Sequence, residues 1–129
     1  MKFVFMAVFG LIGIFARYFL GLLAGRYFAA PFPYGTFLIN LIGSFLIGVV
    51  YVLGAEKGIL NPDLRLGIVV GLLGGFTTFS AYSLETTRLI EESQLWFAAL
   101  YFCLSPLAGL LSAFGGLYLT RSLMNGGVT

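Results

Sequence analysis

The sequence has no histidine, a single cysteine and few acidic residues, and each scarcity excludes a class of protein. Without histidine, and with Cys103 as the only thiol, the chain cannot form a cysteine–histidine metal cluster or an intrachain disulfide. None of the five acidic residues lies in the central part of an apolar stretch, so we expect no buried acid–base pair. The sequence therefore predicts neither an enzyme nor a nucleic-acid-binding protein, and Cys103 is expected to be a small buried packing residue.

What the chain has instead is apolar sequence, which makes up 60% of its 129 residues, while charged residues make up 9%. An average soluble domain has about 25% charged residues, and a transmembrane helix needs about 20 apolar residues. We predict an all-α membrane protein, with residues 1–129 as a single four-helix transmembrane domain. Arg17 interrupts the first apolar run, so we expect that run to be retained as a helix and not cleaved as a signal peptide. The predicted spans are residues 3–25, 35–54, 66–87 and 95–119.

The distribution of basic residues favours neither orientation in the membrane strongly. Four spans would place both termini on one side, together with the polar loop 56–65, in which Asn61-Pro62 is expected to act as a breaker. The basic residues on that side are Lys2, Lys57, Arg65 and Arg121, and those on the other side are Arg26 and Arg88. Because this bias is small, we predict dual topology, in which two copies of opposite orientation pair about a two-fold axis in the membrane plane. The Gly126-Gly127 tail is expected to fray.

The third apolar stretch contains a segment that simple membrane crossing does not require. Residues 74–83 combine two adjacent glycines, four hydroxyl side chains and three aromatic rings. Adjacent glycines loosen a helix, and hydroxyl groups supply hydrogen-bond donors where no water is present. We therefore predict a break in the third helix, with free backbone carbonyls beside a row of donors, and hence an ion site. Gly67, Gly71 and Gly75 recur at four-residue spacing, which predicts close helix packing.

The polar side chains within the spans suit an anion. All except Arg17 are neutral donors: Thr36, Asn40, Ser44, Thr77, Thr78, Ser80, Ser83, Ser105 and Ser112. Phe79 and Tyr82 are three residues apart, and the edge of an aromatic ring carries partial positive charge that can face a small anion. Arg17 has two possible roles, as a charge in an aqueous vestibule or as an interfacial anchor beside Tyr18. Phe76 is expected in the core, and Glu85 at a helix end.

Three motifs resemble those of the Fluc (CrcB-type) fluoride channel family. They are GIFARY at 13–18, GTFLIN at 35–40 and GGFTTFS at 74–80. Their order, their spacing and the four-span length match the family over essentially the whole chain. The first motif departs from it, because the family usually has alanine where this chain has Ile14.

The resemblance implies an antiparallel dimer in a prokaryotic cell membrane, with two pathways for passive fluoride export. It also implies a central Na⁺ on the two-fold axis, held by backbone carbonyls that would here be those of Gly74 and Thr77 from both subunits. The pathway residues carried over are Asn40, Phe79, Tyr82, Ser80 and Ser83, with Thr36, Arg17 and either Ser105 or Ser112 beside them. The family commonly has phenylalanine in place of Tyr82, so its phenol needs a partner or joins the polar lining. Because the motifs around Asn40 and Phe79 are intact, we expect a homodimer.

Two other functions are compatible with a short four-span chain. The first is a dual-topology exporter of small cations that resembles the small multidrug resistance proteins, but this chemistry needs a carboxylate in the first span, where the chain has Arg17. The second is an accessory subunit that only packs against a larger transporter. Fluoride transport by the purified chain alone would distinguish the channel from both.

Overall fold

The computed structural model describes residues 1–126, and these residues are all-helical apart from short turns. Within this range four helical segments are long and apolar enough to cross a membrane, as predicted: Lys2–Tyr27, Tyr34–Glu56, Pro62–Glu91 and Leu95–Asn125. The first is α1 (Lys2–Tyr27), and the second is α2 (Tyr34–Tyr51), which continues as the π-helix η1 (Val52–Glu56). The third consists of α3 (Pro62–Leu66), the π-helix η2 (Gly67–Leu73), α4 (Gly74–Phe76) and α5 (Phe79–Glu91). The fourth is α6 (Leu95–Asn125). Gly127, half of the tail expected to fray, lies outside the described residues.

The third helix begins earlier than the sequence predicted. Asn61 does not break a helix but caps one, because its side-chain Oδ1 accepts a hydrogen bond of 2.8 Å from the Leu64 amide. Pro62 occupies the first turn, where its missing N–H costs nothing. The predicted loop 56–65 is therefore shorter, since residues 62–65 are helical.

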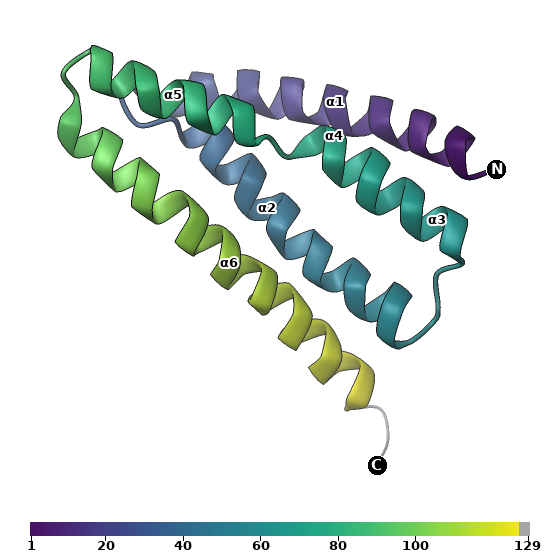
Figure 1. The fold of residues 1–129 in the computed structure, drawn as a ribbon. Coiled ribbons are helices and arrows are strands. Elements are labelled where there is room, and N and C mark those ends of the chain that lie inside the picture. Colours follow the sequence, from purple (N-terminus) through teal and green to yellow (C-terminus); the bar gives the residue numbers. More distant parts are fainter. Residues whose placement is uncertain (127–129) are drawn as a thin grey trace.

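The helices pack as two neighbouring pairs, α1 along η2 and α4, and α2 along α6 (Figure 1). The N-terminus, the turn between η1 and α3, and the end of α6 lie at the same end of the bundle (Figure 1). The turns from α1 to α2 and from α5 to α6 lie at the other end. The N-terminus, the middle loop and the end of α6 are thus grouped at one end, which is the arrangement that four spans predict.

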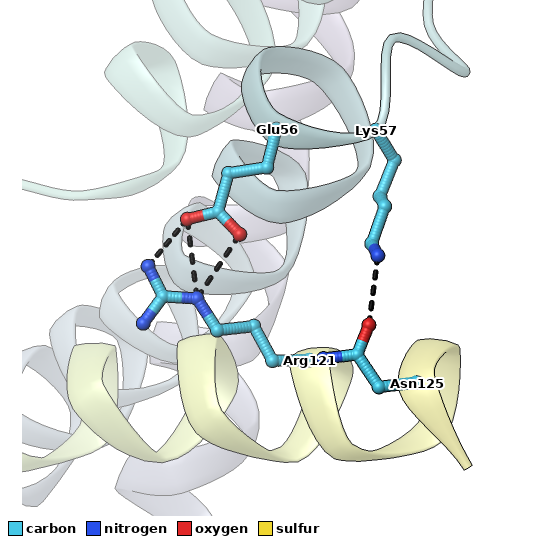
Figure 2. Close-up of polar contacts among 4 residues, drawn as sticks. All are labelled: Glu56, Lys57, Arg121 and Asn125. Carbon is cyan, nitrogen blue, oxygen red and sulfur yellow. Dashed lines mark hydrogen bonds and ion pairs between the residues drawn. The ribbon is translucent and has the colours of Figure 1, made fainter.

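Two polar contacts join the end of the second span to the end of the fourth (Figure 2). The Arg121 guanidinium donates through Nε to Glu56 Oε1 and Oε2 at 3.1 and 3.0 Å, and through Nη2 to Oε1. The Lys57 ammonium donates to Asn125 Oδ1 at 2.8 Å. Such exposed pairs add little to stability, but the bidentate geometry fixes how the two helix ends face each other.

Glycines allow both helix pairs to pack closely, as the four-residue spacing predicted for the third span. A Cβ on Gly71 would lie 2.7 Å from the Met6 carbonyl oxygen, and one on Gly75 would lie 2.8 Å from the Gly10 carbonyl oxygen. In the second pair, a Cβ on Gly116 of α6 would overlap the Phe45 carbonyl of α2. The backbones therefore approach each other at distances that only glycine permits.

The prediction that Cys103 is buried is wrong, because its side chain is exposed on α6. The fourth helix turns Ser112 towards α2, where its hydroxyl donates to the Leu41 carbonyl at 2.8 Å. Nine residues are two and a half helical turns, so Cys103 lies on the opposite face. Phe76, in contrast, is in the core as expected, with an exposed fraction of 6%.

Candidate ion pathway at the helix break

The third membrane helix is interrupted at Thr77 and Thr78, between α4 and α5 (Figure 1). Both residues are extended, with φ and ψ of −82° and 156° for Thr77 and −151° and 116° for Thr78. The predicted break is therefore present, but it comes after the paired glycines, which are themselves helical in α4. Thr78 caps the next helix, since its Oγ1 accepts a hydrogen bond of 3.2 Å from the Ala81 amide.

Asn40 of α2 holds the broken segment through both ends of its amide. Its Nδ2 donates to the Thr78 carbonyl at 3.0 Å, and its Oδ1 accepts from the Thr78 amide at 2.8 Å. Asn40 thus gives the Thr78 N–H an acceptor in place of a helical carbonyl, and it adds a side-chain donor to the Thr78 carbonyl at the N-cap of α5. A primary amide has two N–H donors, so one donor of Asn40 remains after the bond to Thr78.

Two backbone carbonyls at the break lose their ordinary helical donors. In a continuous helix the Gly74 carbonyl would accept from the Thr78 amide, but this amide donates to Asn40. The Thr77 carbonyl would accept from the Ala81 amide, which instead donates to Thr78 Oγ1. Gly74 is exposed and Thr77 is half-buried in the single chain. Neutral carbonyl oxygens are the ligands that protein sites use to replace the hydration shell of a monovalent cation.

Two grooves meet at Thr78. The first, which we call the vestibule groove, has a volume of about 800 Å³ and is lined by Arg17, Thr36, Thr78 and Glu85 among others. The second, the aromatic groove, has a volume of about 580 Å³, and its lining includes Asn40, Thr77, Thr78, Phe79, Tyr82 and Ser105. The two grooves share Thr78, and together they are lined by Arg17, Thr36, Asn40, Phe79, Tyr82 and Ser105 of the predicted residues, but not by Ser80, Ser83 or Ser112.

Glu85 is the functional candidate that the sequence analysis missed. It is half-buried on α5 and accepts hydrogen bonds from Thr36 Oγ1 at 2.6 Å and from the Tyr101 hydroxyl at 2.8 Å. It is therefore a bonded acceptor within the vestibule groove and not only the helix-end group that the sequence predicts. A signal was present in the sequence, because Glu85 comes three residues after Tyr82 and so falls near the same face of the helix.

The two aromatic residues of α5 differ in exposure. The Phe79 side chain is 78% exposed, whereas Tyr82 is buried. Their ring centroids are 5.5 Å apart, and the Tyr82 hydroxyl donates to the Phe102 carbonyl of α6 at 2.8 Å. The phenol therefore finds a partner in the backbone and does not join the polar lining.

Ser80 and Ser83 of α5 lie on the same exposed side as Phe79. Ser83 Oγ donates to the Phe79 carbonyl at 3.0 Å, and Ser80 Oγ lies 3.3 Å from Thr78 Oγ1. Such hydroxyls can rotate away from a carbonyl to donate to an anion. Both serines are exposed in the single chain.

Of the two serines considered in the fourth helix, only Ser105 lines the aromatic groove. Ser112 lies in the packing between α6 and α2, with its hydroxyl bonded to the Leu41 carbonyl. Arg17 is half-buried and lines the vestibule groove. Within residues 1–126 it forms no ion pair, which suits a charge that faces an aqueous entrance.

Four apolar helices, a broken third helix and a line of neutral donors define a small multi-pass membrane protein built to pass an ion. The family model described as CrcB-like protein, Camphor Resistance (CrcB), matches residues 4–117. The chain belongs to this family, as the three motifs predicted.

Curated bacterial relatives cover nearly the whole chain. A protein of Geobacter sp. (strain M21), named fluoride-specific ion channel FluC, is 42% identical over 93% of this chain and 97% of its own length. A protein with the same name from Geotalea uraniireducens (strain Rf4) is 37% identical over 92% of this chain and 96% of its own length. The protein with this name from Allorhizobium ampelinum is 42% identical over 93% of this chain and 96% of its own length.

Proposed function

We propose that the protein is a fluoride-selective channel that conducts F⁻ passively out of the cell. The observation that carries this proposal is the match, over nearly the full length, to relatives named as fluoride-specific ion channels. A channel of this kind is not an enzyme, in agreement with the sequence. The cation-exporter alternative is not retained, because the first helix, α1, carries no carboxylate and the family is a different one.

The line of neutral donors supports a mechanism in which many weak contacts replace the hydration shell of fluoride. Arg17 would raise the local anion concentration in the vestibule groove. The free N–H of Asn40, the hydroxyls of Ser80 and Ser83, and the ring edge of Phe79 would then act in sequence. Because the amide, the hydroxyls and the ring edge are all neutral, none of them would bind the ion tightly enough to trap it. Thr36 and Ser105 would complete the polar lining, and Tyr82, whose hydroxyl is bonded to the Phe102 carbonyl, would line the aromatic groove beside them.

The exposed side of α5 supports an antiparallel homodimer of this one transmembrane domain of residues 1–129. Phe79, Ser80 and Ser83 are exposed beside the helix break, at membrane depth. Lipid tails accept no hydrogen bonds, so polar groups at this depth face protein or water. A second copy of opposite orientation would cover this face and enclose the two grooves as pathways.

Dual topology has a direct test in the position of the C-terminus. We expect a reporter fused after Thr129 to give signals from both sides of the membrane in comparable amounts, because the basic residues differ only as four against two. A fusion with three added lysines next to the C-terminus provides the control, since it should drive the reporter to the cytoplasm. If the unmodified fusion reports from one side alone, the antiparallel dimer is contradicted.

The freed carbonyls at the break support a structural Na⁺ at the centre of that dimer. The Gly74 and Thr77 carbonyls of both chains would hold it, and no side-chain carboxylate is needed. The ion would supply a fixed positive charge on the two-fold axis and hold the two breaks together. The donor set fits a monovalent cation, because neutral backbone carbonyl oxygens can replace part of its hydration shell.

Fluoride efflux from liposomes reconstituted with the purified chain alone tests the function. With valinomycin and K⁺ present, we expect rapid fluoride efflux and negligible chloride efflux from a matched chloride-loaded sample. A Phe79→Ile variant should be strongly slowed, because an aliphatic side chain of similar bulk has no positive ring edge. Phe3→Ile, at the exposed start of α1, is the control and should conduct normally. No fluoride flux from folded wild-type protein would reject the channel.

A further inference from the structure

Pro106 and Tyr82 are linked through a single backbone carbonyl. Pro106 lies inside α6 and has no N–H, so it cannot donate to the Phe102 carbonyl four residues earlier. The Tyr82 hydroxyl, from α5, donates to that carbonyl at 2.8 Å. The acceptor that proline leaves without a helical donor is thus satisfied by the Tyr82 hydroxyl.

The same hydrogen bond fixes the direction of the Tyr82 ring. This ring lies between the rings of Phe79 and Tyr101, with centroid separations of 5.5 and 5.2 Å. Both Tyr82 and Pro106 line the aromatic groove. A bond at the far end of a side chain with only two rotatable torsions holds the whole ring. It also points the hydroxyl at the α6 backbone.

We propose that Tyr82 and Pro106 are a pair of positioning residues for permeation, in which proline frees the Phe102 carbonyl and the tyrosine hydroxyl uses it to hold the ring beside Phe79. This inference rests on the proposed fluoride-channel function. It has a specific consequence for mutation. Removing the hydroxyl leaves the carbonyl unpaired when residue 106 is proline, but not when residue 106 supplies an N–H.

Thermal unfolding in detergent tests the hydrogen-bonded pair without reference to conduction. Four proteins are compared: wild type, Tyr82→Phe, Pro106→Ala and the double variant. We expect Tyr82→Phe to lower the unfolding midpoint by about 5 °C in the proline background and by about 1 °C or less in the alanine background. Tyr27→Phe, which alters a side chain that is 77% exposed, is the control and should leave the midpoint unchanged. Equal shifts in both backgrounds would overturn the pairing.

Fluoride efflux by the same four proteins, measured well below every midpoint, tests the role in permeation. We expect Tyr82→Phe to conduct about tenfold more slowly per channel than wild type, and the double variant to conduct at the rate of Pro106→Ala alone. The ratio of fluoride to chloride flux should fall only in Tyr82→Phe. If unfolding shows the coupling but the fluxes and this ratio do not change, the pair is structural only and its role in permeation is overturned.

Failure of this proposal differs from failure of the proposed function. Wild-type protein that conducts no fluoride overturns the channel and, with it, the role of the pair in permeation, while the unfolding cycle still decides whether the hydrogen-bonded pair exists. If wild-type protein conducts fluoride but Tyr82→Phe shifts the unfolding midpoint equally in the proline and alanine backgrounds, only the proposed pairing of Tyr82 with Pro106 is overturned.

Discussion

Replacing Asn40 with alanine should reduce fluoride efflux by about 100-fold. Asn40 makes two hydrogen bonds to the Thr78 backbone, at 3.0 and 2.8 Å, and these hold the extended segment between α4 and α5. Each such bond is worth about 1–1.5 kcal/mol, so losing both removes about 2–3 kcal/mol that orders the break, which corresponds to about 100-fold in rate. The variant also lacks the remaining N–H that would contact the anion. Efflux from liposomes measures the loss.

The same variant tests the proposed Na⁺. If Asn40 keeps the Thr78 amide away from the Gly74 carbonyl, its removal should release this carbonyl to a helical bond and lower the sodium content. Elemental analysis should find one sodium per two wild-type chains and clearly less in Asn40→Ala. Asn125→Ala is the matched control, because it removes an asparagine whose partner, Lys57, lies at the exposed end of the bundle. Dimeric wild-type protein without sodium would contradict the cation site, and normal efflux by Asn40→Ala would contradict the holding role.

Gly116→Ala should prevent normal packing of α6 on α2. A Cβ at this position would overlap the Phe45 carbonyl, and the carbonyl carbon would lie 3.0 Å away. Because the obstacle is backbone and not the end of a flexible side chain, the two helices must separate, at a cost of about 3 kcal/mol. We expect a large fall in the thermal midpoint and in the yield of folded protein.

The neighbouring glycine provides the matched control for this prediction. A Cβ on Gly115 would find its nearest neighbour, Phe45 Cδ2, at 3.9 Å, which is ordinary van der Waals contact. Gly115→Ala should therefore fold normally, since alanine also has the higher helix propensity. Equal midpoints for the two variants would show that the close approach at Gly116 does not limit stability.

Sequence patterns predicted the elements of this fold better than they predicted the causes of particular features. The broken third helix was inferred from Gly74-Gly75, but the structure uses Gly75 for contact with α1 and breaks the chain at Thr77 and Thr78. A local glycine signal cannot distinguish backbone freedom from close packing, because that difference depends on what lies opposite. The prediction that Asn61-Pro62 breaks the chain was wrong for a related reason, since the same two residues can end one helix or begin the next.

The sequence did not predict the hydrogen-bond partners of individual side chains. Glu85 looked like a helix-end residue because only the three-dimensional fold brings Thr36 and Tyr101 to its carboxylate. The partner of the Tyr82 phenol, a backbone carbonyl, leaves no trace in the identity of residue 102. Asn40, Phe79 and Tyr82, in contrast, were inferred from their side-chain chemistry and from motif resemblance, and all three line the aromatic groove.

The ion pair between Glu56 and Arg121 has a consequence for the biogenesis of the protein. It forms only after the second and fourth helices have both entered the bilayer, so the insertion machinery meets Arg121 as an uncompensated charge. Orientation responds to lysine and arginine, and acidic residues contribute little to it. Under the proposed dual topology, the count of basic residues would set how newly made chains divide between the two orientations, while the folded protein pairs one of those charges with Glu56.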